Sequence, residues 1–197
     1  MLRNMSTFSA KIDLHKRLIE PYTNHRIVKL SALKEYFSET HEVEKLLQTR
    51  GDFVVYEYYE KTFESGMGHV NFGLTVMYPG KVGREYFMTR GHFHEKPAAE
   101  IYYGLEGEGL IVMQTADGVV EARELTPNSV VYVPPGWGHR TVNTGSKELV
   151  FFFAYPFDAG HDYEIVKTKG FAKLVVEENG RPKLVDNPKY LTSSVKG

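Results

Sequence analysis

The chain has 197 residues, enough for one domain with a substantial core. Its 24 basic and 25 acidic residues balance to a formal charge of −1, which argues against nucleic acid or a membrane surface as a partner. Cysteine is absent, so disulfides and thiolate metal sites are excluded, and a cytoplasmic location is expected. The start of the chain lacks the apolar block of a signal peptide, and the longest apolar run, residues 149–154, suits a strand and not a membrane span.

The first fifty residues predict an arm followed by a helical region. Residues 1–28 show no clean periodicity and are expected to form an arm with one strand near residues 8–14. Residues 31–50 predict a short turn and then a helix, which Ser38 is expected to cap and Gly51 to end. The apolar face of this helix is formed by Val43, Leu46 and Leu47.

From residue 53 the pattern changes to short strands separated by turns. The predicted strands cover residues 53–59, 70–78, 84–93, 100–106, 109–114, 119–125, 129–133, 140–143, 149–154, 172–177 and 182–185. Many short strands at regular spacing predict an all-β fold, either an antiparallel sandwich or a small barrel with room for one small ligand in its mouth. We expect one domain over residues 1–197, with its barrel at 51–185 and a polar tail at 186–197.

Two separated segments place histidines where they could bind a metal. His92 and His94 are two residues apart in a predicted strand and therefore face the same way, and Glu100 begins the next strand. His139 follows a turn and begins another strand. A His-x-His pair alone is equally consistent with solvated or core histidines, but these four residues together predict a divalent metal site with open positions. Surface positions are expected for His15, His25, His41 and His69.

The same residues resemble the two cupin motifs. His92, His94, Glu100 and Gly107 match the first motif, and Pro134, Gly136, His139 and Asn143 match the second. Asn128 stands where glycine is usual, which a left-handed turn would explain. Residues 78–83, 89–94, 131–135 and 159–163 further resemble the cupin-type glucose-6-phosphate isomerases best known from archaea. This resemblance spans roughly residues 50–190 and implies a cupin barrel, or jelly roll, after a short helical N-terminal segment.

The resemblance implies a metal-dependent enzyme that interconverts glucose 6-phosphate and fructose 6-phosphate. Fe²⁺ is the expected metal, one per subunit, and Mn²⁺, Ni²⁺ and Zn²⁺ are alternatives that also accept imidazole and carboxylate ligands. Glu100 is either the base of a proton-transfer route or a ligand only, and a hydride shift stays open as the second route. His161 and Tyr102 are further candidates for proton handling. The residues that the resemblance places around the phosphate are Tyr56, Thr75, Thr89, Gly91, Tyr155 and Tyr163. Arg90 is left out of the predicted site.

Two other functions remain open: another metal-dependent cupin enzyme, such as an iron dioxygenase, and a sugar-binding cupin without catalysis. The many hydroxyl side chains among the candidate residues favour the isomerase. The 13 tyrosines and 12 phenylalanines exceed what one barrel interior can hold, so we predict a homodimer, with residues 1–28 as a candidate for its interface.

Overall fold

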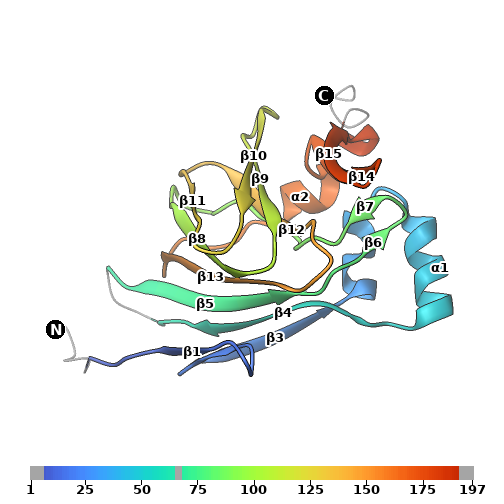
Figure 1. The fold of residues 1–197 in the computed structure, drawn as a ribbon. Coiled ribbons are helices and arrows are strands. Elements are labelled where there is room, and N and C mark those ends of the chain that lie inside the picture. Colours follow the sequence, from blue (N-terminus) through green and yellow to red (C-terminus); the bar gives the residue numbers. More distant parts are fainter. Residues whose placement is uncertain (1–6, 65–67, 191–197) are drawn as a thin grey trace.

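The computed structural model describes residues 7–64 and 68–190, and its largest feature is a six-stranded antiparallel sheet (Figure 1). The strands lie in the order β11-β8-β13-β5-β4-β3. Their bounds are β3 Asn24–Lys29, β4 Val54–Lys61, β5 Val70–Met77, β8 Glu100–Glu106, β11 Val130–Val133 and β13 Leu149–Pro156. Because side chains alternate along each strand, one face of this sheet points into a barrel and the other points outward.

A second sheet, of three strands in the order β10-β9-β12, faces the first and encloses the core (Figure 1). Its strands are β9 Gly109–Gln114, β10 Val120–Leu125 and β12 Gly138–Asn143. Aliphatic and aromatic side chains fill the space inside, among them Met77, Ile111, Leu125, Val131, Leu149 and Phe151. The predicted all-β barrel is therefore confirmed, and β8 and β9 begin and end at the predicted residues.

A third sheet and the helices cover one end of the barrel (Figure 1). The sheet has the order β15-β14-β7-β6, with β6 Lys81–Val82, β7 Glu85–Tyr86, β14 Lys173–Glu178 and β15 Arg181–Asp186. The helices are a 3-10 helix, η1 Leu30–Tyr36, and the α-helices α1 Thr40–Arg50 and α2 Glu164–Lys169, the last of which the sequence analysis missed. No helix in the described ranges is long and apolar enough to cross a membrane.

Residues 7–28 hold more structure than the predicted arm, although the one strand predicted near residues 8–14 is confirmed by Lys11–Asp13. β1 Lys11–Asp13 and β2 Leu18–Glu20 form a hairpin, and the buried Ile19 belongs to a small core cluster with Leu74, Val76 and Val150. β3 pairs along its length with β4 and extends the main sheet. Its residues are mostly polar, and Val28 is the one buried residue of the strand, so β3 has no apolar alternation that the sequence analysis could detect. Residues 1–6 lie outside the described residues.

Helix α1 lies where the sequence predicts a helix, and it ends at Gly51 as predicted, with the Gly51 N–H donating to the carbonyl of Leu47. The predicted cap is wrong. Glu39 precedes the helix, while the N–H and hydroxyl of Ser38 donate to the Glu85 carboxylate at 3.0 and 2.9 Å. A buried carboxylate without hydrogen-bond donors costs more free energy than a helix end exposed to water, so Ser38 donates to Glu85 and does not cap the helix.

The predicted polar tail is packed at its start. Asp186 ends β15, and Asn187 is 4% exposed, with its side-chain amide donating to the carbonyl of Phe171 at 2.7 Å. This amide bond fastens the chain beyond β15 to the rest of the fold. Residues 191–197 of the predicted tail are not among the described residues.

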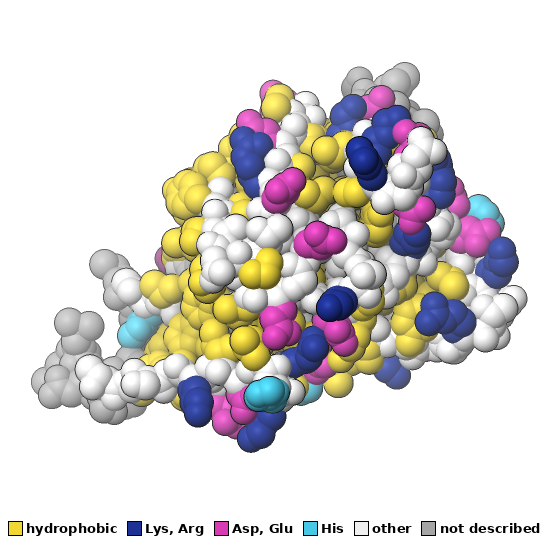
Figure 2. Space-filling model, in the orientation of Figure 1, with side chains coloured by type: hydrophobic (Ala, Val, Ile, Leu, Met, Phe, Trp, Pro, Cys, Tyr) yellow, Lys and Arg dark blue, Asp and Glu magenta, His cyan; other side chains and the backbone are white. Residues whose placement is uncertain are grey.

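Hydrophobic side chains also gather on the outer surface at the β8 and β11 side of the barrel, on the left of the molecule in Figure 2. The large exposed ones there are Ile101, Val130 and Tyr132, which are 44%, 65% and 57% exposed. Ile101 and Tyr132 are cross-strand partners, so they form one continuous apolar surface.

Candidate active site

The segment that carries His92 and His94 is not the predicted strand over residues 84–93. Only Glu85–Tyr86 forms a strand, and beyond it the chain touches its neighbours through single bridges, including one between His92 and His139. Gly91 has φ +72°, and a Cβ there would lie 2.8 Å from both the His139 carbonyl and the Arg140 Cβ. The left-handed backbone at Gly91 interrupts the strand and lets the segment lie directly against β12.

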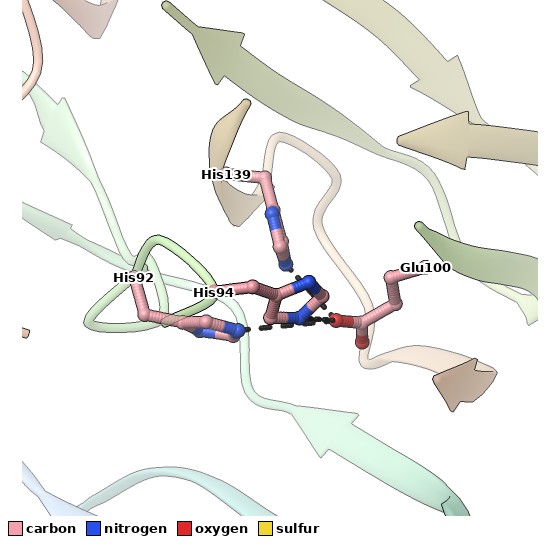
Figure 3. Close-up of side chains that lie close together, drawn as sticks. All are labelled: His92, His94, Glu100 and His139. Carbon is pink, nitrogen blue, oxygen red and sulfur yellow. Dashed lines mark hydrogen bonds and ion pairs between the residues drawn. The ribbon is translucent and has the colours of Figure 1, made fainter. Parts of the chain in front are cut away.

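His92, His94, Glu100 and His139 point toward one another, as Figure 3 shows, and their ligand atoms lie within 4.8 Å of each other. The bridge brings His92 and His139 together, because each donates its backbone N–H to the other's carbonyl, at 3.1 and 2.9 Å. Glu100 begins β8 with its side chain on the inner face. Its Oε2 lies 3.8 Å from Nε2 of His92, 3.2 Å from that of His94 and 3.1 Å from that of His139.

Backbone carbonyls fix how two of the imidazoles present their nitrogens. Nδ1 of His94 lies 2.9 Å from the Ala98 carbonyl, and Nδ1 of His139 lies 3.2 Å from the Trp137 carbonyl. Since a carbonyl oxygen can only accept, each Nδ1 carries the proton, and in the neutral ring Nε2 keeps its lone pair. Both lone pairs then face the Glu100 oxygen.

The cluster combines deep burial with close opposite charge. Burial alone would raise the pKa of Glu100, but His139 and His94, which donate to it when their rings are protonated, hold that pKa well below its usual range. Burial, assisted by repulsion from His139, lowers the pKa of His92 well below its ordinary value. Near neutral pH the site therefore holds an ionised carboxylate and an uncharged His92, the protonation states that a metal ion requires.

The donor set fits a divalent metal ion. Ligand atoms about 2.1 Å from a common centre lie about 3 Å apart at right angles and about 3.4 Å apart at tetrahedral angles. The three nitrogen–oxygen separations fall near this range. Nε2 of His92 is buried and lacks a hydrogen-bond partner among the described residues, so its lone pair is available to a cation. The Nδ1–H···O=C bonds of His94 and His139 are the supporting contacts that metal-binding histidines commonly make.

A cavity of about 280 Å³ opens over this cluster and brings the predicted substrate residues together. Its lining includes all six residues assigned to the phosphate, namely Tyr56, Thr75, Thr89, Gly91, Tyr155 and Tyr163. Tyr102 and His161 line it as well. The His161 ring centroid is 4.3 Å from that of His92 and 5.1 Å from that of Tyr155, and the Tyr102 ring is 5.8 Å from that of His139.

Two side chains in the cavity wall, those of Thr89 and Tyr163, keep a hydroxyl proton that they can donate. The hydroxyl oxygen of Thr89 accepts from the N–H of Thr141 at 3.0 Å, which leaves the hydroxyl proton of Thr89 available. Burial raises the pKa of Tyr163 to about 12, so this phenol stays protonated and able to donate at neutral pH. Both groups can serve as donors to an anion.

Four polar or charged lining residues are not in the predicted site: Tyr58, Glu60, Arg90, which the sequence analysis left out, and Thr141. Arg90 is the one Lys or Arg that lines the cavity in the described part of the chain, and its Nε is buried without a hydrogen-bond partner. Its carbonyl accepts from Nη2 of the buried Arg140 at 2.7 Å, which fixes the backbone of this segment. Strand alternation from Tyr56 through Tyr58 to Glu60 was the signal that could have found the β4 residues.

The remaining histidines lie away from the cluster. His15, His25 and His41 are exposed, as predicted, and His25 pairs with Glu57 at 2.7 Å while its ring stacks on Tyr59. His69 is half-buried and stacks on Phe63 at 4.7 Å, so its predicted surface position is only partly right.

A two-sheet β-barrel with three histidines and one glutamate converging inside it defines the chain as a cupin with a candidate metal centre. Comparison with known proteins adds the family. Residues 28–191 match the model of the family described as glucose-6-phosphate isomerase. The chain belongs to this glucose-6-phosphate isomerase family, and with it to the isomerases.

Relatives cover almost the whole chain. The glucose-6-phosphate isomerase of Thermococcus gammatolerans is 50% identical over 184 residues, which are 93% of this chain and 96% of the relative. The enzyme of Thermococcus kodakarensis is 50% identical over 91% of this chain and 94% of the relative. The enzyme of Pyrococcus furiosus is 45% identical over 93% of this chain and 96% of the relative. A more distant solved structure, of an oxalate oxidase, is 17% identical and covers 65% of this chain and 57% of its own, with a TM-score of 0.44.

Proposed function

We propose that this protein interconverts glucose 6-phosphate and fructose 6-phosphate with one divalent metal ion held by His92, His94, Glu100 and His139. The observation that carries the proposal is the single cavity in which this cluster and a set of anion donors face the same space. Its family membership supports the reaction. Fe²⁺ is the metal we expect, because nitrogen and carboxylate donors suit it, with Mn²⁺, Ni²⁺ and Zn²⁺ as the alternatives.

His92, His94, Glu100 and His139 would hold the divalent cation, which would supply Lewis acidity for the isomerisation of the open-chain sugar. The carboxylate of Glu100 is the candidate base for moving a proton between C1 and C2, and its low pKa suits it better to binding a cation than to holding a proton. This favours Glu100 as a ligand first, and it keeps a hydride shift between the two carbons as the second route.

His161 and Tyr102 are the candidates for proton handling at the sugar oxygens. Burial lowers the pKa of His161, so its ring is neutral near pH 7 and can accept a proton from a hydroxyl. Burial, with the nearby Glu100 charge, raises the pKa of Tyr102 well above its usual value, so its phenol keeps its proton and can donate. The two side chains therefore offer an acceptor and a donor to the same bound sugar.

The phosphate is proposed to bind at the wall formed by Thr89, Arg90 and Gly91. The guanidinium of Arg90 supplies the positive charge that a dianion needs, and the hydroxyls of Thr89 and Tyr163 supply neutral donors. Tyr56 and Thr75, which line the same cavity, are proposed as further contacts. Tyr155, which was predicted with these residues, lines the same cavity and is proposed as another contact.

An isomerase assay with fructose 6-phosphate tests the proposal. Chelation should abolish turnover, and adding back Fe²⁺ or Mn²⁺ should restore it. Turnover that resists complete chelation, or no turnover with any divalent metal, would contradict it. A dioxygenase would instead consume oxygen, and a sugar-binding cupin would bind the sugar phosphate without turning it over, so oxygen consumption and direct binding distinguish the two alternatives.

We also propose that two copies form a homodimer in the cytoplasm. The exposed apolar surface of Ile101, Val130 and Tyr132 supports an interface at β8 and β11, since such surfaces are commonly covered by a partner. Residues 1–28 were a candidate for the interface, but the β1–β2 hairpin within them already packs on its own main sheet. The outer face of β8 and β11 is therefore the better candidate.

A further inference from the structure

The segment that carries His92 has one residue more than the part of β12 that it faces. Met88 bridges to Val142, and four residues later His92 bridges to His139, which is only three residues from Val142. One extra residue opposite a strand is a β-bulge, a feature that turns side chains and is common beside active sites. The left-handed backbone of Gly91, with φ +72°, lies within this bulge.

The extra residue decides which side chains face the cavity. Thr141 and His139 are two apart in β12, and both line the cavity. Their partners Thr89 and His92 are three apart and also line it, because the bulge makes up for the odd spacing. In a pairing without the bulge, Gly91 would stand opposite His139, and His92 would point away from the cavity.

Arg140 lies between His139 and Thr141 in β12, so its side chain points to the opposite face, away from the cavity. There its Nη2 donates to the carbonyl of Arg90 at 2.7 Å, and its guanidinium carbon lies 4.4 Å from the centre of the Phe171 ring. Arg140 is 4% exposed, so water competes little for this bond. The residue opposite the bulge therefore holds a carbonyl that belongs to the bulge.

A carboxylate accompanies this buried guanidinium. Glu85 of β7 is also 4% exposed and lines the same small pocket as Arg140 and Met88. It is the one acidic residue of that pocket in the described ranges. Removing the charge of Arg140 alone would leave the Glu85 carboxylate buried without its counter-charge, which is strongly destabilising. The positioning effect of Arg140 is therefore separable from its effect on stability only when the charge balance is kept.

We propose that Arg140 is a positioning residue, which holds the bulge so that Thr89 and His92 face the cavity together. One side chain behind the wall thereby sets both a hydroxyl of the proposed phosphate site and an imidazole of the proposed metal site. The inference rests on the proposed function for what these two groups bind. A wall fixed in this way needs little ordering when a ligand binds, and such preorganisation increases affinity.

Titration calorimetry with two probes, Mn²⁺ and inorganic phosphate, tests the proposal, with phosphate added to the Mn²⁺-loaded protein. Arg140→Lys keeps a positive charge beside Glu85, but an ammonium lacks the planar fork that bonds the Arg90 carbonyl while it covers Phe171. The variant should raise the Kd for each probe about threefold to tenfold, as one lost hydrogen bond predicts. Arg181→Lys, the same change at an exposed position of β15, should alter neither Kd.

A second variant removes both charges of the pair. Arg140→Met together with Glu85→Gln should regain most of the unfolding temperature that Arg140→Met alone loses, because no buried charge is left unbalanced. Its Kd for both probes should nevertheless stay raised, since the Arg90 carbonyl still lacks its donor. If either folded variant, Arg140→Lys or the double variant, binds both probes as tightly as the parent, Arg140 is only structural and the proposal fails. A raised Kd for one probe alone would also contradict it.

Neither probe is turned over, so this outcome is independent of catalysis. A parent protein without isomerase activity, whose variants still lose affinity for both probes, would refute the proposed function and leave the positioning role standing. An active parent whose variants bind both probes normally would do the reverse.

Discussion

The imidazole of His94 is fixed at both of its nitrogens. Nδ1 donates to the Ala98 carbonyl in the turn before β8, and Nε2 faces Glu100 at the start of that strand. The side chain therefore depends on local backbone geometry as well as on the cluster. This double attachment explains why a turn of fixed shape separates the His-x-His pair from its carboxylate partner.

Replacing His94 with alanine should reduce metal affinity at least about a hundredfold, since even the loss of a supporting contact to a metal ligand costs about tenfold to a hundredfold. Metal content after dialysis, measured by elemental analysis, checks this. Chelation should lower the unfolding temperature of the parent protein, because a ligand bound only to the folded state stabilises it. The variant should no longer respond. His25→Ala, which changes an exposed histidine, is the matched control and should retain metal; equal metal in both variants would remove His94 from the site.

Glu85 is a buried carboxyl that does not belong to the histidine cluster, and it makes the stability of the fold depend on pH. Burial raises its pKa above the ordinary 4.5, and the two bonds from Ser38 oppose that only in part. The folded state therefore binds the Glu85 proton more tightly than the unfolded state does. Its stabilising contribution is complete below the unfolded pKa and is lost as the pH rises through the folded pKa.

Glu85→Gln should accordingly gain stability relative to the parent as the pH rises from 4 to 7, by about 1.4 kcal/mol for each unit by which the folded pKa exceeds the unfolded one. Free energies of unfolding from denaturant titrations at several pH values measure this difference. Glu124→Gln, at an exposed position of β10, should run parallel to the parent. A constant difference between Glu85→Gln and the parent across this range would show that the folded pKa is not raised.

At the scale of elements, the short segment from Met88 to Phe93 matters most. It lies against β12 through isolated bridges in place of a continuous ladder, and Gly91 allows the close approach. Its position is set by backbone bonds from Thr89 and His92 to Thr141 and His139. The segment carries His92 of the cluster, and leads directly to His94, on a backbone that is neither a strand nor a free loop.

Gly91→Ala should therefore displace this segment. The left-handed backbone should destabilise the alanine variant by about 1–2 kcal/mol, and the clash with β12 should add about 1–3 kcal/mol. Gly136 has a similar φ of +82° but open space at its Cβ position, so Gly136→Ala should pay only the first cost. Denaturant unfolding and metal content together check the pair. Equal losses in both variants would mean that the close approach at Gly91 carries no energy.

Much of the barrel could be predicted from the sequence, because β8 alternates, β9 is a short apolar run, and turns bound both strands. The αL position of Asn128 was also predicted correctly, with φ +68°. Two features could not be predicted. β3 is mostly polar and has one buried residue, Val28, so it lacks an apolar pattern, and Ser38 donates to Glu85, a partner 47 residues away. Tertiary contacts of this kind leave no local signal in the sequence.

The candidate site divides in the same way. Histidines two apart face one side in a strand, and this rule brought His92 and His94 together even though the strand itself is interrupted. Arg90 and Glu60 were missed because their direction depends on a local turn and on where β4 ends. Metal-binding histidines could be predicted from their spacing, whereas the positions of Arg90 and Glu60 in the cavity could be recognised only from the three-dimensional fold.

For the whole molecule, the apolar surface over β8 and β11 leads to the prediction of a homodimer. Light scattering at micromolar concentration should give about twice the mass of one chain, 22.5 kDa. Val130→Lys together with Tyr132→Lys should shift the protein toward the monomer, because a charged interface centre disfavours association. Val119→Lys, at an exposed apolar residue just before β10, serves as the control. A parent protein that is already monomeric would refute the prediction.

The segment from Thr89 to His94 carries both proposed binding functions on one stretch of backbone. In the proposed site its first half would offer a hydroxyl and a guanidinium to an anion, and its second half would offer two imidazoles to a cation. Because one stretch of backbone carries both, occupancy at either end restricts the other. The free energy of such coupling is reciprocal, so whatever the ion contributes to holding the sugar phosphate, the sugar phosphate contributes equally to retaining the ion.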